Sequence, residues 1–213
     1  MSTKRTRIRD PEQTRAALIA ATVRLMLRQG YAATSVDQIC AQANATKGAF
    51  FHHFSGKEAA CEAAIQWWGQ MGASEYAAAW RNASASARER LLQMIDIMSG
   101  FTQRGEPVRC MVGMMSQELG QTHVLIRAAC GQELDNWSHE VAQMLEAARL
   151  EANPSPDFDA AQVAWYLNSL WQGSMLVSKV KAQPQIIRDN LALARDWIEH
   201  LLGEPAKVSH SAG

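Results

Sequence analysis

Apolar residues in this chain recur with a helical period almost everywhere, and this pattern most narrows the folds open to it. Leu18, Ala21 and Leu25 form one apolar row, with Ile19 and Met26 beside it. Strand-like alternation of β-branched and aromatic residues over five or more positions does not appear. We therefore expect an all-α fold of about nine helices.

Helix start and stop signals divide the chain into segments. Asp10 and Pro11 predict the start of a first helix and Gly30 predicts its end. Two short helices follow, separated by Asn44, a residue that tolerates left-handed backbone. A fourth helix begins at Lys57 and continues through Trp67 and Trp68, and a small polar stretch at 83–86 predicts a break. The remaining breakers leave long helices at 123–151, 159–181 and 184–202.

The charge of the chain is unevenly distributed. The 213 residues carry 21 basic and 21 acidic side chains, a balance that by itself argues against a partner held by bulk charge. Residues 1–60, however, hold nine basic and four acidic side chains, a net charge of +5, which leaves −5 for the rest. Such asymmetry favours an acidic partner at the N-terminal end. The run Lys4–Arg9 is either a solvated tail or an arm that reaches a DNA minor groove.

Several classes of protein are excluded by composition. No apolar run approaches the 18 residues of a membrane span, and the basic N-terminus lacks the apolar segment of a secretory signal. Four widely spaced cysteines form neither a disulfide framework nor a metal-binding pattern. We expect a soluble cytoplasmic protein with reduced thiols, no metal and no cofactor.

The two short helices predict a helix-turn-helix, a motif whose second helix enters the DNA major groove. That helix must start with small or polar residues, because its N-terminal end contacts base edges. Thr46, Lys47, Gly48 and Ala49 meet this requirement. The side chains expected to contact phosphates and set the register on DNA are Thr34, Ser35, His52 and Lys57.

The same region carries a resemblance to a known family. The segments Ala33–Ile39, Ala43–Phe54 and Lys57–Ala59 resemble the DNA-binding signature of the TetR/AcrR family of transcriptional regulators, over about residues 12–60. The resemblance implies an all-α homodimer that binds a palindromic operator, usually as a repressor released by a small molecule. It also implies an N-terminal arm and DNA-binding domain at 1–56, a ligand-binding and dimerisation domain at 57–203, and a flexible tail at 204–213.

Two residues depart from the family pattern. Asn44 stands where glycine is usual, and asparagine accepts the same backbone conformation. Phe51 stands where the family usually has a tyrosine whose hydroxyl reaches a phosphate. Phe51 therefore remains a candidate DNA contact without that hydrogen bond. Either His52 or Lys57 takes a larger share of the backbone contacts, or the affinity for DNA is lower.

The C-terminal part offers candidates for an effector site. Methionine and tryptophan as a group suit a pocket for apolar ligands, although any single one of them fits an ordinary helical core better. The candidates are Cys110, Met114, Met115, Trp137 and Trp171. The segment Arg109–Gly113, with Trp171–Gly173 and Lys179, is similar to a subgroup that responds to electrophiles and unsaturated acyl compounds. In that subgroup a cysteine placed like Cys110 can be the sensor, and a helix N-terminus favours its thiolate. The alternative is a buried, inert cysteine.

The last two predicted helices are the expected dimer interface. Apolar stripes run along both, and small residues among large ones permit close helix approach. The stripes consist of Ala161, Ala164, Leu167 and Leu170 on the first helix and of Leu191, Ala194, Ile198 and Leu201 on the second.

These features together predict a DNA-binding transcriptional regulator, a repressor released by a small apolar or electrophilic effector. One alternative is a pure thiol switch that acts through Cys110. The other is a helical-bundle enzyme, but the chain lacks the Glu-x-x-His, phosphate-loop and nucleophile motifs that such an enzyme would need. We therefore expect no catalytic activity.

Overall fold

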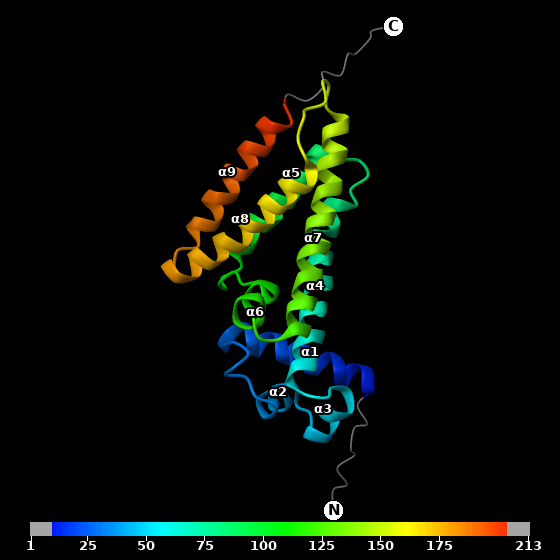
Figure 1. Cartoon of the computed structure of the whole chain (residues 1–213), viewed down its shortest axis with the longest axis vertical. Helices are drawn as coiled ribbons and strands as arrows, with labels where there is room; N and C mark the ends of the chain where they lie inside the picture. The colour runs from blue at the N-terminus through cyan, green and yellow to red at the C-terminus, as the bar shows by residue number, and fades with distance from the viewer. Residues whose placement is uncertain (1–9, 204–213) are drawn as a thin grey trace, which may run out of the picture. The chain divides into compact units, whose positions relative to one another are not determined.

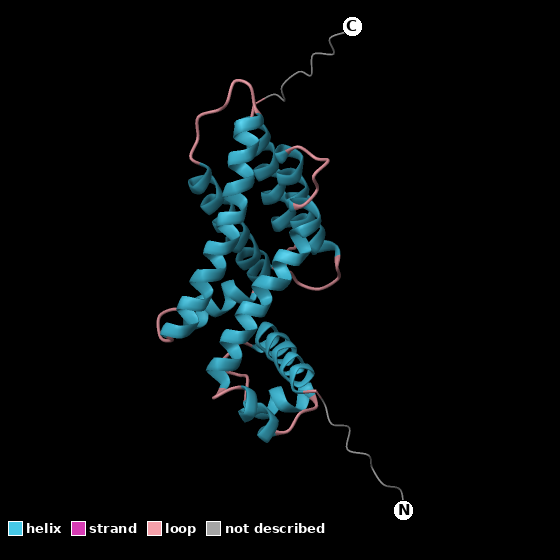
Figure 2. Ribbon diagram, turned by 90° about the vertical axis from the view of Figure 1, so that its right-hand side faces the viewer, coloured by secondary structure: helices cyan, strands magenta, loops and turns pink. Residues whose placement is uncertain are grey.

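The computed structural model describes residues 10–203, and these form nine α-helices, one short 3-10 helix and no strand (Figures 1 and 2). The all-α prediction is confirmed. The predicted arm and the tail at 204–213 lie outside the described residues. The helices are α1 Pro11–Gln29, α2 Val36–Ala43, α3 Lys47–His53, α4 Lys57–Trp80, α5 Ala87–Gly100, η1 Phe101–Gln103, α6 Met111–Leu119, α7 Val124–Glu151, α8 Ala160–Lys181 and α9 Gln185–Leu201.

Local capping explains several of these boundaries. The Asp10 carboxylate accepts a hydrogen bond from the Glu12 N–H at 3.1 Å, and Pro11 occupies the first helical position of α1. Asn44 ends α2 in the left-handed conformation, with φ of 51°. The fourth helix extends beyond Trp68 to Trp80 before the chain breaks at the polar stretch predicted there. Among the described residues, no helix is both long enough and apolar enough to cross a membrane.

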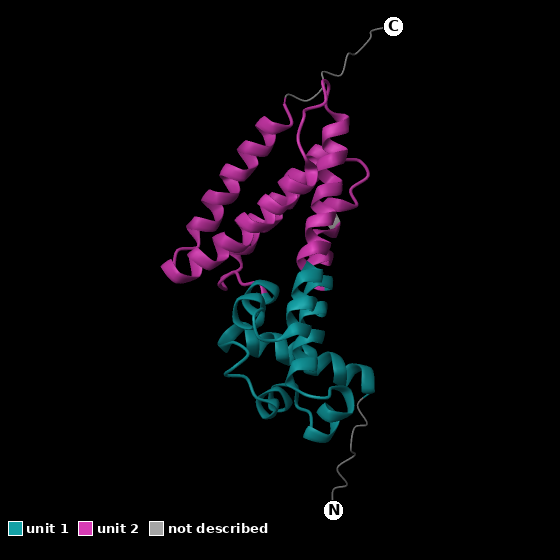
Figure 3. Cartoon of the chain, viewed as in Figure 1, with its two compact units in different colours: residues 1–70, 111–133 teal, residues 71–110, 134–213 magenta. Residues whose placement is uncertain are grey.

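The chain divides into two compact units (Figure 3). Unit 1 contains residues up to Gln70 together with 111–133, and unit 2 contains 71–110 together with the chain from Leu134 onward. Each unit therefore includes part of α4 and part of α7, which are continuous helices. The predicted boundary after Gly56, between a DNA-binding domain and a ligand-binding and dimerisation domain, stays a prediction.

Unit 1 is built on α1, which packs against α2, α3 and α6. Its largest fully buried side chains include Leu18 and Met26 from α1, Ile39 from α2 and Phe50 from α3. The Phe50 and Phe54 rings lie 5.5 Å apart and both are buried, which is usual for aromatic side chains at helical spacing. The short helix pair is thus fixed by its own core side chains.

Unit 2 buries most of the apolar stripes that the sequence assigns to the dimer interface, although Ala161 is exposed and Leu170 and Leu201 are only partly buried. Helix α9 packs against α8 and α5. The stripe residues Ala164, Leu167, Leu191, Ala194 and Ile198 are all buried in the core of this unit. The helical period correctly identifies an apolar face here. That face covers the unit's own core, so a dimer would have to use other side chains of α8 and α9.

Candidate nucleic-acid interface

Helices α2 and α3 form a compact pair with a defined turn. The Ser35 hydroxyl and the Gln38 side chain cap α2 reciprocally. After Asn44, the Thr46 hydroxyl accepts a hydrogen bond from the Ala49 N–H at 3.1 Å and so caps α3. These caps satisfy N–H groups that have no partner within each helix and set where α3 begins.

The start of α3 presents small and polar side chains to solvent. Thr46, Lys47 and Gly48 are exposed and Ala49 is half-buried. A Cβ atom placed on Gly48 would meet only the Thr46 hydroxyl, at 3.8 Å, so the surface beside it is open. This is the profile that close approach to a base edge requires.

The rest of α3 divides between core and surface. Phe51 is 57% exposed and its ring stands edge-on to Phe50 at 5.3 Å, while His52 is exposed beside it. An exposed aromatic ring without a hydroxyl offers an apolar contact, such as to a thymine methyl group. The structure therefore brings six predicted side chains, Thr46 to Ala49, Phe51 and His52, onto one short helix with its cap.

Thr34 and Ser35 are engaged within the protein. Thr34 is buried, and its hydroxyl donates to the Gly30 carbonyl at 2.7 Å. Ser35 is exposed, but its hydroxyl serves as the cap of α2. Both residues therefore position the helix pair in the free protein, and a phosphate contact would have to compete with these bonds.

Lys57 is also engaged internally. Its Nζ donates to the Tyr31 carbonyl at 2.9 Å and lies 4.0 Å from the centre of the Tyr31 ring. This cation–π contact and hydrogen bond tie the start of α4 to the segment that follows α1. A role as a phosphate contact remains a prediction.

Glu118 on α6 is a positioning residue that sequence reasoning missed. Its carboxylate accepts hydrogen bonds from the Tyr31 N–H at 2.9 Å and the Ala32 N–H at 2.8 Å. Lys57 and Glu118 therefore both bind the backbone of the segment between α1 and α2. No local signal reveals this contact, because Glu118 lies 87 positions from Tyr31 in the chain.

Lys47 has a partner that the sequence did not identify. Its Nζ lies 2.8 Å from the Asp37 carboxylate on α2. The hydrogen bond to Asp37 raises the pKa of Lys47 above its usual value. The first residue of α3 is thus already paired with an acid in the free protein.

The candidate effector residues are distributed over both units. Met114 and Met115 belong to α6 in unit 1, and Met115 is fully buried. Cys110, Trp137 and Trp171 belong to unit 2, where Trp171 is part of the buried core and the other two pack against it.

Around Cys110 the side chains are mainly aromatic. The Gln172 amide lies 3.6 Å from the Cys110 sulfur. Trp171 faces Phe101, with ring centres 6.3 Å apart, and Phe101 faces Tyr76 at 6.0 Å. Burial, and after it the nearby Cys110, raises the pKa of Tyr76, whose hydroxyl is hydrogen-bonded to Trp137.

One indole in this region lacks a partner. Trp80 stacks on Tyr76 with ring centres 5.3 Å apart. Its Nε1 atom is buried and has no hydrogen-bond acceptor in the described part of the chain. Burying an unpaired donor costs about 1–3 kcal/mol, so an acceptor brought by a ligand would be stabilising here.

The four cysteines differ in accessibility. No disulfide joins them, and only Cys110 is partly exposed while Cys40, Cys61 and Cys130 are buried. Burial raises the pKa of the Cys61 thiol to about 12, which keeps it protonated and unreactive at neutral pH. Accessibility therefore favours Cys110 for thiol chemistry.

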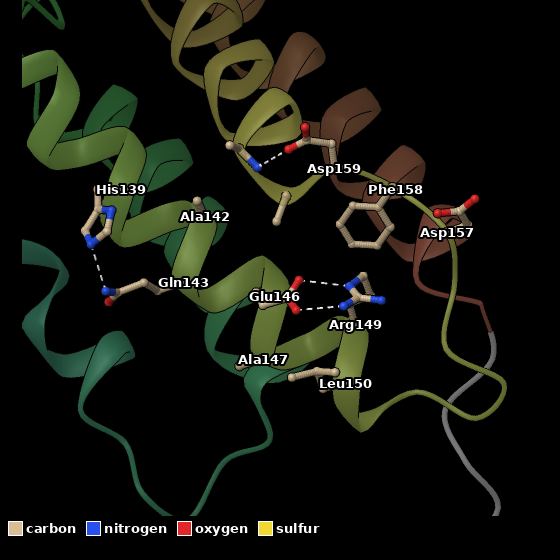
Figure 4. Close-up of a pocket in the computed structure, with 12 residues that line it drawn as sticks. His139, Ala142, Gln143, Glu146, Ala147, Arg149, Leu150, Asp157, Phe158 and Asp159 are labelled. Atoms are coloured by element: carbon tan, nitrogen blue, oxygen red, sulfur yellow. Dashed lines mark hydrogen bonds and ion pairs between the residues drawn. The ribbon is translucent and has the colours of Figure 1, made fainter.

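A separate open cavity of about 780 Å³ lies in unit 2, between the last turns of α7 and the start of α8 (Figure 4). Three of its charged groups are already engaged: Arg149 holds the Glu146 carboxylate through two hydrogen bonds, and Asp159 caps α8. None of the predicted effector residues lines this cavity. The paired charges and the open shape do not favour it as an effector site.

Two sequence-family models match the chain. The one described as bacterial regulatory proteins of the tetR family matches residues 18–64, which include α2 and α3. The one described as the tetracyclin repressor-like C-terminal domain matches residues 87–194. Together they cover both the helix pair and most of unit 2.

Individual relatives agree with this match. The transcriptional regulator AcuR of Cereibacter sphaeroides is 28% identical over 171 residues, which cover 79% of this chain and 77% of the relative. The HTH-type transcriptional repressor NemR of Escherichia coli K12 is 23% identical over 194 residues, which cover 91% of this chain and 96% of NemR. The HTH-type transcriptional repressor DhaR of a Mycobacterium species is 23% identical over 199 residues, covering 92% and 96%.

Solved structures share the fold. The crystal structure of a regulatory protein TetR from Rhodobacter sphaeroides superposes with a TM-score of 0.77 at 26% identity, over 86% of this chain and 97% of that one. The reduced form of Escherichia coli NemR superposes with a TM-score of 0.77 at 24% identity, over 91% and 98%.

Proposed function

The chain belongs to the TetR family of bacterial regulatory proteins, and on that premise we propose that it is a repressor whose operator binding is relieved by a small effector. It is a DNA-binding transcriptional regulator and not an enzyme. The observation that carries the proposal is the exposed, small and polar start of α3, held in place by buried aromatic side chains.

In the proposed complex, α3 enters the major groove of the operator. Thr46, Lys47 and Gly48 face base edges, and Phe51 contributes an apolar contact. Ser35 and His52 lie at the flanks of the helix pair, where contacts to phosphates set the register. Unit 1 supports this because its core orders the helix pair before DNA arrives, which lowers the entropic cost of binding.

The proposed assembly is a homodimer through α8 and α9. These two helices expose several large apolar side chains that the unit's own core does not cover: Trp165, Tyr166, Leu176, Val177, Val180, Leu193 and Trp197. Tyr166 and Trp197 bridge the two helices, with ring centres 5.0 Å apart. An apolar surface of this kind favours association, and a two-fold dimer suits a palindromic operator.

The proposed effector is small, apolar and equipped with a hydrogen-bond acceptor. The aromatic cluster around Cys110 would receive its apolar part and the Trp80 indole N–H would donate to its acceptor. An unsaturated carbonyl compound meets this description. The Cys110 thiolate would add to its β-carbon; the C–C π bond breaks, its electron pair moves to the α-carbon, and that carbon takes up a proton.

The effector acts by shifting a conformational equilibrium. It must bind the DNA-incompetent state more tightly than the competent one, because equal affinity shifts nothing. Helix α4 is the proposed carrier, since it starts beside the helix pair at Lys57 and continues into the effector unit as far as Trp80.

The DNA-binding part of the proposal is tested with duplexes selected from a random-sequence library by the full-length protein. Lys47→Ala and Gly48→Glu should abolish binding to the selected duplex while the circular dichroism spectrum stays unchanged. The fold should be unaffected because Lys47 is exposed and the space beside Gly48 is open in the free protein. Normal binding by both variants would contradict the assignment of α3.

The effector part is tested with a simple acceptor-bearing electrophile, acrolein, and a non-reactive analogue, propanal. Release of the duplex by acrolein alone, lost in Cys110→Ser, supports the covalent route. Release by both compounds, retained in Cys110→Ser and weakened in Trp80→Phe, supports reversible binding. If neither compound weakens duplex binding, this class of effector is wrong.

A further inference from the structure

The surface proposed to read DNA contains an ion pair between its two helices. Lys47 is the first residue of α3 and Asp37 lies in the first turn of α2. Their charged atoms are 2.8 Å apart, and the side chains are 64% and 66% exposed. An acid is thus placed on the same surface that would face the phosphates of DNA.

The position of each residue explains why the pair forms. The N-terminal end of a helix carries a partial positive charge, which favours Asp37 and disfavours Lys47. A carboxylate beside Lys47 offsets that unfavourable position. In the free protein the charge of Lys47 is therefore balanced locally rather than available to any polyanion.

The pair also constrains the direction of the Lys47 ammonium group. A lysine ammonium has three donors, so one can remain on Asp37 while the others reach acceptors such as O6 and N7 of a guanine. A phosphate contact is different, because a phosphate beside Lys47 must also approach the negative charge of Asp37. The pair is therefore compatible with a base contact and opposes a backbone contact.

From this geometry we infer that Asp37 is a specificity-determining residue, which holds Lys47 toward base edges and weakens its attraction to phosphates of DNA in general. The inference rests on the proposed DNA-binding function. Non-specific binding consists almost entirely of phosphate contacts, so the negative charge of Asp37 lowers the affinity for non-specific DNA more than the affinity for the operator. Asp37 thereby increases the ratio of operator affinity to non-specific affinity.

The test compares Asp37→Asn with the wild-type full-length protein on two probes: the duplex selected from a random library and a shuffled duplex of the same length and composition. For the variant, affinity for the shuffled duplex should rise about three- to tenfold at low salt, and affinity for the selected duplex should stay level or fall. The slope of log affinity against log salt on the shuffled duplex should steepen by about one.

Three controls separate the ion pair from simple charge. Asp135→Asn removes the same charge from an exposed position on α7, and it should leave the affinity ratio unchanged. Asp37→Glu keeps the charge, so it should retain most of the ratio of selected-duplex affinity to shuffled-duplex affinity. In a Lys47→Met background, Asp37→Asn should no longer change the affinity for the shuffled duplex beyond the change caused by Asp135→Asn.

The outcomes distinguish failure of the inference from failure of the proposed function. If the wild-type protein selects no duplex and shows no salt-dependent binding, the proposed function is wrong. If it selects a duplex but Asp37→Asn keeps the wild-type ratio, the role of Asp37 is wrong. If Asp37→Asn raises the affinity for the shuffled duplex equally with and without Lys47, Asp37 acts by charge alone, and the inference that it works through Lys47 is overturned.

Discussion

Gly30 ends α1 in a backbone conformation that only glycine adopts readily. Its φ is 83° and its ψ is 173°. For any other residue this backbone conformation costs about 1–3 kcal/mol of conformational free energy. A Cβ atom at this position would also lie 2.9 Å from the Glu118 carboxylate. The residue therefore sets both the exit of α1 and the space in which Glu118 reaches the next two N–H groups.

Gly30→Ala should lower the free energy of unfolding by about 1–3 kcal/mol, as measured by urea denaturation. The matched control is Gly131→Ala in α7, where a Cβ atom meets nothing within 4 Å. Alanine there should stabilise the helix by about 0.5–1 kcal/mol. A Gly30→Ala variant as stable as the wild type would contradict the conformational argument.

Cys61 gives the protein a predictable response to alkaline pH. Its thiol has a pKa of about 12 in the folded chain because it is buried, against about 8.5 in an unfolded chain. Above about pH 8.5 the unfolded chain loses this proton while the folded one keeps it. The stability contributed by Cys61 is therefore complete below about pH 8.5 and declines as the pH rises toward 12.

This is checked by urea denaturation of the wild type and Cys61→Ala between pH 7 and pH 10.5. The wild type should be the more stable at pH 7, because the substitution leaves a small cavity. That advantage should narrow steadily as the pH rises above about 8.5. A constant difference over the whole range would mean that Cys61 ionises equally in both states.

The short helices α2 and α3 depend on elements distant in sequence for their placement. Lys57 from α4 and Glu118 from α6 bind the carbonyl and the N–H of Tyr31, and Glu118 also binds the Ala32 N–H. Isolated helices of seven or eight residues are not stable in water, so such contacts and the core decide their orientation.

Glu118→Ala should reduce affinity for the selected duplex about tenfold, because it frees the segment that leads into α2. Loss of stability should be about 1 kcal/mol, since both hydrogen bonds are exposed and water can replace the carboxylate. Gln117→Ala, at the neighbouring exposed position of α6, serves as control and should behave as the wild type. Affinity is read by fluorescence anisotropy and stability by urea denaturation.

In the assembled protein, DNA binding would depend on how charge is distributed along the chain, and dimerisation would depend on the exposed apolar side chains. A dimer would present two N-terminal segments of +5 each to DNA although the whole chain has no net charge. Binding to DNA should therefore weaken steeply with salt. The dimer itself would rest on the apolar side chains of α8 and α9 that the core of unit 2 leaves exposed.

Val180→Glu combined with Leu193→Glu should convert a dimer to a monomer in sedimentation velocity, because both side chains are exposed, at 75% and 66%, on the proposed interface. Helix content should stay constant and affinity for the selected duplex should fall more than tenfold. Leu150→Glu places one such charge at an exposed leucine of α7 and should leave the dimer intact. A double variant that remains dimeric would place the interface elsewhere.

The sequence by itself determined the helices, the helix pair and the family, because these depend on signals a few residues apart. Asp10, Gly30, Asn44 and Thr46 each act on the backbone beside them, and Phe50 and Phe54 are buried as helical spacing predicts. Such short-range signals can be recognised in the sequence without knowledge of the tertiary packing.

Only the tertiary structure decided which side chains are free to act. Lys57 meets Tyr31 across 26 positions and Glu118 meets it across 87, distances at which sequence spacing says nothing about contact. The stripes on α8 and α9 show the same limit: the period identifies an apolar face but not the surface that covers it. In this chain that surface is the unit's own core, because α9 packs on α8 and α5.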